Sequence, residues 1–170
     1  GASEVISNSS NVVMNGGTLS TGSAAGNSET VGTLTLNANS TINLGTGSHN
    51  LNFAASNGAT WTGGALMRIN GWTGSYNGTT GTAGKIYAGS SAELSAAKLN
   101  QIYFYKSGGG QYKASQLGTG EIVPTSALPV QLIYFNECGP ILGHQWRDSC
   151  RVHRFHQLCD QRGECHPSAQ

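Results

Sequence analysis

Short pairs of apolar residues, separated by single polar residues, recur along the first half of the chain and constrain its fold more than any other feature. An apolar residue at every second position is typical of a β-strand that buries one face. The pairs recur about every eight or nine residues, which predicts a series of short strands joined by turns. They are Leu34/Leu36, Ile42/Leu44 and Leu51/Phe53, followed by Trp61 and by Leu66 with Ile69.

Asn-Gly dipeptides mark the expected turns. Asn and Gly tolerate the positive φ angle that tight turns require, so these dipeptides interrupt strands rather than continue them. They occur at Asn15-Gly16, Asn57-Gly58, Asn70-Gly71 and Asn77-Gly78.

The small residues between the apolar pairs predict the architecture. The segments are nearly all Gly, Ser, Thr and Asn, and the chain of 170 residues contains 25 glycines, which suits an elongated fold with a thin core. Stacked β-rungs need small or ladder-forming residues at their corners. We therefore expect an all-β fold, a fragment of a right-handed parallel β-helix (solenoid), and the alternative is a β-sandwich.

A different texture begins after Gly84 and predicts a C-terminal cap. Lys85–Tyr87 and Ile102–Tyr105 are expected to be strands, and Ser95–Gln101 one or two helical turns with Ser95 as the N-cap. Larger apolar residues in a last rung would cover the end of a solenoid against edge pairing. The predicted organisation is rungs over residues 1–84, a cap with one short helix over 85–123, a linker over 124–136 and a tail over 137–170.

Several segments of the chain resemble a known protein family. The segment Thr33–Phe53, T-L-T-L-N-A-N-S-T-I-N-L-G-T-G-S-H-N-L-N-F, resembles the autotransporter-associated β-strand repeats of secreted bacterial surface proteins. The segments W-T-G-G, I-N-G-W-T-G, L-S-A-A-K-L-N-Q-I and T-G-E-I-V-P are similar to the closing part of such passengers. The resemblance covers roughly residues 30–124.

A second resemblance lies in Leu128–Phe135, which is similar to the L-P-V-x-L-x-x-F segment that precedes C-terminal sorting domains in many such proteins. Together the two resemblances imply export by a type IX-like route and display on the bacterial cell surface. They imply no catalytic residue. Since the chain begins Gly1-Ala2-Ser3 without an initiator Met, the simplest interpretation is a piece of a longer protein whose export signal lies upstream.

The tail differs in composition from everything before it. Residues 1–136 contain no cysteine and nine charged residues, whereas the 34 residues after them contain all four cysteines, four of the five histidines and eight charged residues. Zinc ligands usually come as C-x(2–4)-C or H-x(3–5)-H, and neither the cysteine pair at 159 and 165 nor the histidine pair at 153 and 156 has that spacing. Three alternatives remain for this tail. It binds zinc, it forms two disulfides, or it results from translation in a wrong reading frame, which would leave residues 137–170 disordered.

Charge and composition exclude several classes of function. The net charge is +1 and the basic residues are scattered, which disfavours nucleic-acid or acidic-lipid partners. No apolar run reaches the roughly 20 residues that span a bilayer. Glycoside cleavage needs paired carboxylates, but there is no Asp before Asp148 and the four Glu residues of the body are far apart in sequence. We expect no enzymatic activity, no cofactor and no metal site.

Exposed aromatic residues offer the main alternative to a structural role, because their faces can stack on sugar rings. The candidate glycan-stacking residues are Trp61, Trp72, Tyr76 and Tyr87. The competing interpretation is that Trp61 and Trp72 fill the core near the end of the solenoid. The sequence thus predicts an extracellular, non-catalytic stalk or passenger segment of a bacterial surface protein, such as an adhesin, and alternatively a carbohydrate-binding module. Surface glycans or other cell-surface proteins would be its partners.

Overall fold

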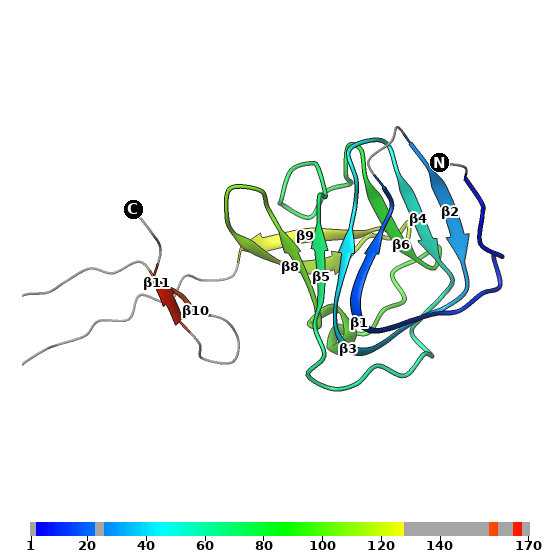
Figure 1. Ribbon diagram of the computed structural model, residues 1–170, viewed down its shortest axis with the longest axis horizontal. Coiled ribbons are helices and arrows are strands. Elements are labelled where there is room, and N and C mark those ends of the chain that lie inside the picture. The colour runs from blue at the N-terminus through cyan, green and yellow to red at the C-terminus, as the bar shows by residue number, and fades with distance from the viewer. Residues whose placement is uncertain (1–2, 23–25, 128–156, 160–164, 168–170) are drawn as a thin grey trace, which may run out of the picture. The chain divides into compact units, whose positions relative to one another are not determined.

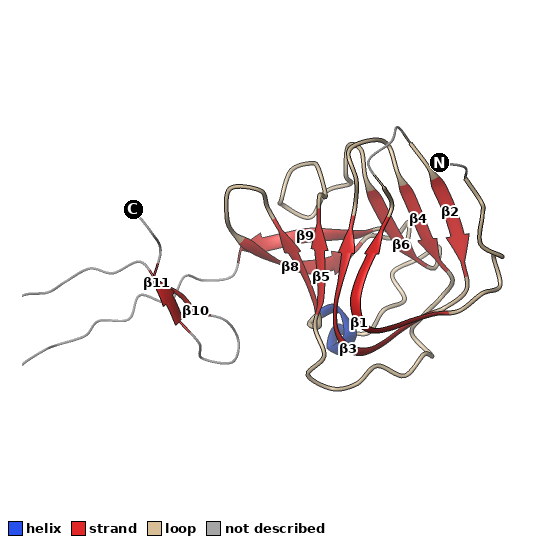
Figure 2. Cartoon of the chain, in the orientation of Figure 1, coloured by secondary structure: helices blue, strands red, loops and turns tan. Residues whose placement is uncertain are grey.

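The computed structural model describes residues 3–22, 26–127, 157–159 and 165–167. The chain divides into two compact units between Leu128 and Pro129, and each is treated by itself. The first unit holds nine strands and one short helix, and the second holds a pair of three-residue strands (Figure 1). Figure 2 shows that strands and loops make up almost all of the first unit. The fold of the described residues is all-β.

The secondary structure of the first unit begins with the long strand β1 (Val12–Ser20). The other elements are β2 (Ser28–Val31), β3 (Leu34–Asn43), β4 (Asn50–Phe53), β5 (Met67–Asn70), β6 (Lys85–Ala88), α1 (Ala96–Leu99), β7 (Ile102–Tyr105), β8 (Gln111–Gln116) and β9 (Ile122–Ala127).

Two sheets share the strands of this unit, and successive strands alternate between them up to β7. The larger sheet has the order β1-β3-β5-β7-β8-β9, and the smaller has the order β2-β4-β6. All pairs among β1, β3, β5 and β7 are parallel, as are both pairs of the smaller sheet. The chain therefore returns to the same sheet after each visit to the other one (Figure 1).

Residues in register across these parallel pairs form apolar columns. One column in the larger sheet runs Leu19, Ile42, Ile69 and Phe104, of which the last three are fully buried. Val31, Phe53 and Ala88 form a column in the smaller sheet. The side chains of both sheets join in a single core cluster. Each fully buried Leu, Ile or Phe contributes on the order of 1.5–3 kcal/mol, so these columns hold the unit together.

The C-terminal part of the first unit changes from parallel to antiparallel pairing. β7 pairs with β8, and β8 with β9, in antiparallel register. The helix α1 precedes β7, and the side chain of Ser95 accepts a hydrogen bond from the Lys98 amide, as an N-cap should. β9 runs to Ala127, so residues 124–127 of the predicted linker belong to a strand.

Three details differ from the sequence pattern. Leu34, Leu36 and Ile42 all lie in one ten-residue strand, β3, rather than in two strands with a turn between them. The apolar pair of β5 is Met67 with Ile69, both fully buried, instead of Leu66 with Ile69. Asn15-Gly16 lies inside β1 at an irregularity in its pairing with β3, not at a turn.

The second unit contributes only the antiparallel pair β10 (Gln157–Cys159) and β11 (Cys165–Pro167), in which Cys159 is the backbone partner of Cys165. Most of the predicted tail, with Cys138, Cys150, His144, His153 and His156, lies outside the described residues, as does the Leu128–Phe135 segment. The zinc, disulfide and reading-frame alternatives therefore stay predictions.

Candidate functional site

Four aromatic residues cluster where the loop between β5 and β6 meets the strands β7 and β8. The ring of Trp72 is 5.0 Å from that of Tyr76 and 5.9 Å from that of Phe104, both in edge-on geometry. Tyr76 in turn lies 4.5 Å from Tyr112. Trp72 and Phe104 are buried, whereas Tyr76 and Tyr112 are partly exposed. The cluster therefore has an inner apolar half and an outer half that faces solvent.

Glycines let the backbone close on Trp72. A Cβ atom at Gly74, whose φ angle is 147°, would collide with the indole ring, and one at Gly81 would lie 2.9 Å from its Nε1 atom. The Tyr76 hydroxyl donates a hydrogen bond to the carbonyl oxygen of Trp72 at 3.0 Å. Both partners of this bond belong to one loop, so the loop is held by its own aromatic residues.

The outer half of the cluster carries a positive charge. The Lys106 ammonium lies 5.4 Å from the centre of the Tyr76 ring, within the range of a cation–π interaction. Burial raises the pKa of Tyr76, and the nearby Tyr112 raises it further. A partly exposed tyrosine pair beside a lysine can stack on a sugar ring and attract a carboxylate or sulfate group on it.

Trp61 lies at a different place, in the loop between β4 and β5. Its side chain is 9% exposed, and its Nε1 atom donates a hydrogen bond to the carbonyl oxygen of Leu34 at 2.8 Å. The Lys98 ammonium lies 5.7 Å from the ring centre. The indole ring is therefore buried, with Lys98 over its face and a hydrogen bond at its nitrogen, and it offers no open face for a ligand.

Lys98 is a buried cation with an unusual set of partners. Its ammonium donates hydrogen bonds to the backbone carbonyl oxygens of Ser56, Asn57 and Ala59 at 2.8, 2.5 and 2.6 Å. The amide of Ser95 also donates to the Asn57 side chain at 2.9 Å. Burial lowers the pKa of Lys98, whereas the three carbonyl partners favour its charged form. The arrangement fastens α1 to the turn after β4.

Tyr87 lies on β6, in register with Asn52 of β4, and is partly exposed. It forms an isolated antiparallel bridge with Glu121. Burial raises the pKa of Tyr87, and the Glu121 carboxylate adds to the effect. No ring contact joins Tyr87 to another aromatic residue among the described parts of the chain.

Glu121 is a buried carboxylate, 1% exposed, immediately before β9. It accepts hydrogen bonds from the Thr80 hydroxyl at 2.5 Å and from the Gly81 amide at 2.8 Å. The Trp72 Nε1 atom, buried close by, has no hydrogen-bond partner within the described residues. Glu121 thus holds the loop between β5 and β6 close to the start of β9, and the described geometry pairs it with no second carboxylate.

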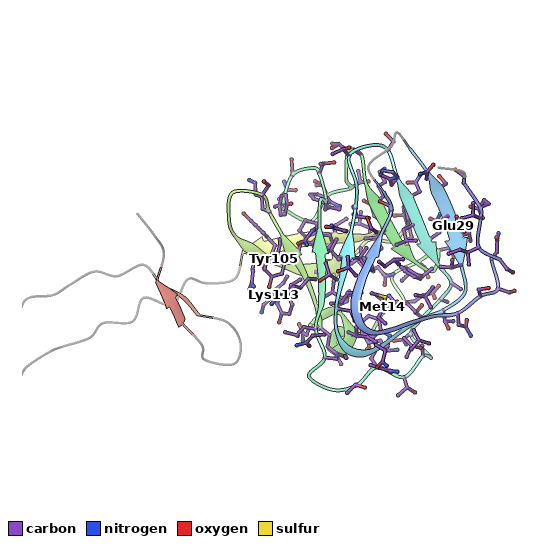
Figure 3. All side chains as sticks on the ribbon, in the orientation of Figure 1. Met14, Glu29, Tyr105 and Lys113 are labelled. Atoms are coloured by element: carbon purple, nitrogen blue, oxygen red, sulfur yellow. The ribbon has the colours of Figure 1, made fainter. Side chains whose placement is uncertain are left out.

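The structure brings two of the four predicted residues together, Trp72 and Tyr76, and places Trp61 and Tyr87 elsewhere. Sequence reasoning missed Tyr112 and Lys106, which complete the exposed half of the cluster. The aromatic strand Ile102–Tyr105 and the glycine loop 108–110 after it predict a hairpin, and a hairpin would have placed Tyr112 opposite Phe104. Tyr105 and Lys113, labelled in Figure 3, belong to the same two strands, and the Arg68 guanidinium lies 5.2 Å from the Tyr105 ring centre.

Among residues 3–22, 26–127, 157–159 and 165–167, no group of three or more His, Cys, Asp or Glu side chains is placed to hold a metal ion. His49 is fully buried there, and its Nδ1 atom accepts a hydrogen bond from the Asn27 amide at 3.2 Å. The described helix is also far too short to cross a bilayer. Comparison with known proteins finds no matching family model, no similar curated protein and no similar solved structure.

Proposed function

We propose that the first unit is a parallel β-solenoid that serves as a rigid, non-catalytic spacer in a secreted or surface-displayed bacterial protein. The observation that supports this proposal best is the return of the chain to the same sheet, in parallel register, at β3, β5 and β7. In this interpretation each rung is one strand of the larger sheet followed by one strand of the smaller sheet.

The spacing between registered residues supports rungs of unequal length. Partners are 22 residues apart between Val12 and Leu34, 27 between Ile42 and Ile69, and 35 between Ile69 and Phe104. The longer spacings accommodate the loops that carry Trp61 and Trp72. Such insertions lengthen a rung without disturbing its backbone ladder, and they carry variable surface features on a constant frame.

Rigidity would come from ladders between rungs as well as from the core. Asn11 Oδ1 accepts hydrogen bonds from the amide and hydroxyl of Thr33, and Ser56 Oγ accepts one from the Leu34 amide. Neighbouring strands lie about 4.8 Å apart, so the four parallel strands β1, β3, β5 and β7 span only about 15 Å. We therefore expect the first unit to act as a stiff module. An adhesion partner would bind to its loops or to another part of the protein.

Single-molecule force spectroscopy tests the mechanical role. The full chain, kept reduced so that its cysteines do not cross-link, is placed between helical marker domains and pulled. We expect it to unfold at higher force than the markers, with length increments that match losses of 22–35 residues at about 3.5 Å per residue. Unfolding at or below the force of the helical markers contradicts a spacer that resists mechanical force.

Display on the cell surface needs its own test. An antibody against residues 3–127 is expected to label intact cells of the source organism, and a protease added to those cells is expected to remove the label. Labelling that appears only after the cells are permeabilised contradicts surface display and leaves the mechanical role to be judged by the pulling experiment.

Carbohydrate binding is the second candidate function, and the partly exposed Tyr76–Tyr112 pair beside Lys106 favours it. A glycan array probed with the full chain is expected to reveal acidic glycans whose binding is lost in Tyr112→Ala and retained in Tyr87→Ala. Trp72→Ala is a poor test because Trp72 is buried and its removal would damage the core. Absence of binding to every glycan on the array contradicts this candidate.

A further inference from the structure

Glu29 occupies a position that neighbouring strands fill with apolar residues. It lies on β2, the edge strand of the smaller sheet, in register with Leu51 of β4 and, beyond it, with Ile86 of β6 (Figure 3). Leu51 and Ile86 are both buried. A carboxylate in this column would be buried without compensation if a further rung lay on β2, which is costly for a charged group. Glu29 therefore marks the end of the proposed stack.

The Glu29 carboxylate is instead engaged by the chain segment that precedes β1. It accepts hydrogen bonds from the backbone amide of Val5 at 2.9 Å and from that of Ile6 at 2.6 Å. Bonds of an amide to an ionised carboxylate are about twice as strong as bonds between neutral groups. One side chain of β2 thus fixes two successive backbone groups of residues 3–10, a segment that we call the strap.

The strap also covers the outer backbone edge of β2. The Glu4 amide donates to the Ser28 carbonyl oxygen at 3.0 Å, and the Ser28 amide donates to the Ser3 hydroxyl at 3.0 Å. The Thr30 hydroxyl donates to the Glu4 carboxylate at 3.1 Å. Both backbone groups of Ser28 that face away from β4 are therefore occupied, and β2 is closed to another strand at this point.

Polar contacts hold the strap in place. All its residues are exposed, and Val5 and Ile6 are 69% and 44% exposed, so the strap buries little apolar surface. Without the Glu29 carboxylate, the remaining bonds would have to offset the conformational entropy of the ordered segment. We therefore expect loss of the Glu29 carboxylate to loosen the strap.

The other edge strand at this end has a different protection. β1 carries an irregularity between Met14 and Asn15, followed by Gly16 and Gly17 with φ angles of 88° and 113°. Such a bulge twists an edge away from regular pairing. β2 is registered with β4 without any shift, so it needs a separate cover.

We propose that the strap, residues 3–10, is an N-terminal cap clamped by Glu29, which keeps the β2 edge from pairing with a second copy of the chain. The proposal rests on the parallel stack proposed above. An uncovered edge strand pairs most simply with the same strand of another copy, in an isologous two-fold dimer. The three large apolar side chains that are exposed among the described residues, Val5, Ile6 and Val13, all lie at this end and would add to such a contact.

Glu29→Leu tests the clamp in the full chain under reducing conditions. Leucine matches the apolar column and removes both charge-assisted bonds, so the core should tolerate it. Glu93→Leu is the matched control. It removes one carboxylate from the loop after β6, the edge strand opposite β2 in the smaller sheet, where Glu93 accepts a bond from the Ser91 hydroxyl. Far-UV circular dichroism verifies that each variant is folded.

Sedimentation velocity over a range of protein concentrations gives the readout. We expect wild type to be monomeric and Glu29→Leu to form dimers. The double variant Glu29→Leu/Thr30→Pro should be monomeric again, because proline removes an outward amide of β2. The dimer dissociation constant of Glu29→Leu should be lower by at least about tenfold than that of wild type or Glu93→Leu. A folded Glu29→Leu that stays monomeric overturns the proposal, as does a wild type that dimerises equally well.

Hydrogen exchange tests the cap formed by residues 3–10 independently of the parallel stack. If the cap exists, the amides of Val5 and Ile6 are protected in wild type and exchange faster in Glu29→Leu. Unprotected Val5 and Ile6 amides together with protected amides in β3, β5 and β7 overturn the cap alone. Loss of protection in β3, β5 and β7 of the wild type counts against the stack on which the cap rests.

Discussion

The ammonium of Lys98 lies over the ring of Trp61, 5.7 Å from its centre, and donates three hydrogen bonds to carbonyl oxygens of the turn 56–59. The partners are about 40 residues apart in sequence. This contact joins α1 to the loop between β4 and β5, so the helix and the parallel strands should unfold together.

Lys98→Met is expected to destabilise the protein. Methionine fills similar volume but leaves three carbonyl oxygens without the partner they have now. Allowing for partial rehydration of these groups, the loss should be about 2–4 kcal/mol in the free energy of unfolding. Urea denaturation followed by tryptophan fluorescence measures it, because Trp61 lies beside the substituted group.

Lys113→Met is the control for that experiment. Lys113 lies on β8 with an exposed side chain, so its replacement should change stability by no more than about 0.5 kcal/mol. Equal effects of the two substitutions would mean that the carbonyl contacts of Lys98 contribute little.

The apolar alternation predicted the buried positions of several strands because it is a local property of the chain. Leu51 and Phe53 are both buried in the four-residue strand β4, two positions apart as expected. The extent of β3 was not predictable in the same way. Asn37 and Asn39 resemble turn residues, yet both lie in the strand, and the Asn39 side chain accepts a hydrogen bond from the Leu66 amide just before β5.

The candidate site was less predictable than the strands, because its contacts join distant residues. Nothing near Lys98 in the sequence indicates that three carbonyl groups of another loop will surround it. The burial of Glu121 likewise depends on Thr80 and Gly81, about 40 residues earlier. An aromatic residue in a polar segment, such as Trp61, is ambiguous until its loop is placed, since both burial and exposure fit the same local pattern.

Tyr87 should make stability fall at alkaline pH. Its pKa in the folded protein is raised above the ordinary 10.0 by burial and by Glu121. Below pH 10 both states keep the proton and the contribution is fully present. As the pH rises from 10 through the folded pKa, the unfolded state loses the proton first, so stability declines.

The difference between wild type and Tyr87→Phe isolates that contribution, because other groups titrate equally in both proteins. Unfolding free energies measured by urea denaturation from pH 8 to pH 11 should decline less steeply above pH 10 in Tyr87→Phe. Parallel profiles for the two proteins would contradict the raised pKa.

Glu121→Ala is expected to loosen the loop between β5 and β6. The substitution leaves the Thr80 hydroxyl and the Gly81 amide without their acceptor and opens a cavity beside Trp72. We expect a loss of about 2–4 kcal/mol and a shift of the tryptophan emission toward longer wavelength as water reaches the indole. Glu93→Ala, at a carboxylate with one hydroxyl partner, should cost less than about 1 kcal/mol and leave the emission unchanged.

Gly71 and Gly64 offer a matched test of how closely the parallel strands pack. Their φ angles are nearly equal, 77° and 82°, so alanine suffers the same backbone strain at both positions, about 1–2 kcal/mol. They differ in their surroundings. A Cβ atom at Gly71 would overlap the backbone carbonyl oxygen of Leu44, next to β3, whereas one at Gly64 meets nothing within 4 Å.

Gly71→Ala should therefore cost at least about 2 kcal/mol more than Gly64→Ala, because the overlap can be relieved only by moving the backbone after β5 away from that after β3. Thermal and urea unfolding of the two variants measure the difference. The Leu44 amide donates to the Asn70 carbonyl oxygen at 2.9 Å, so exchange of that amide should quicken in Gly71→Ala and not in Gly64→Ala. Equal stability and equal exchange in the two variants would contradict the close approach of these turns.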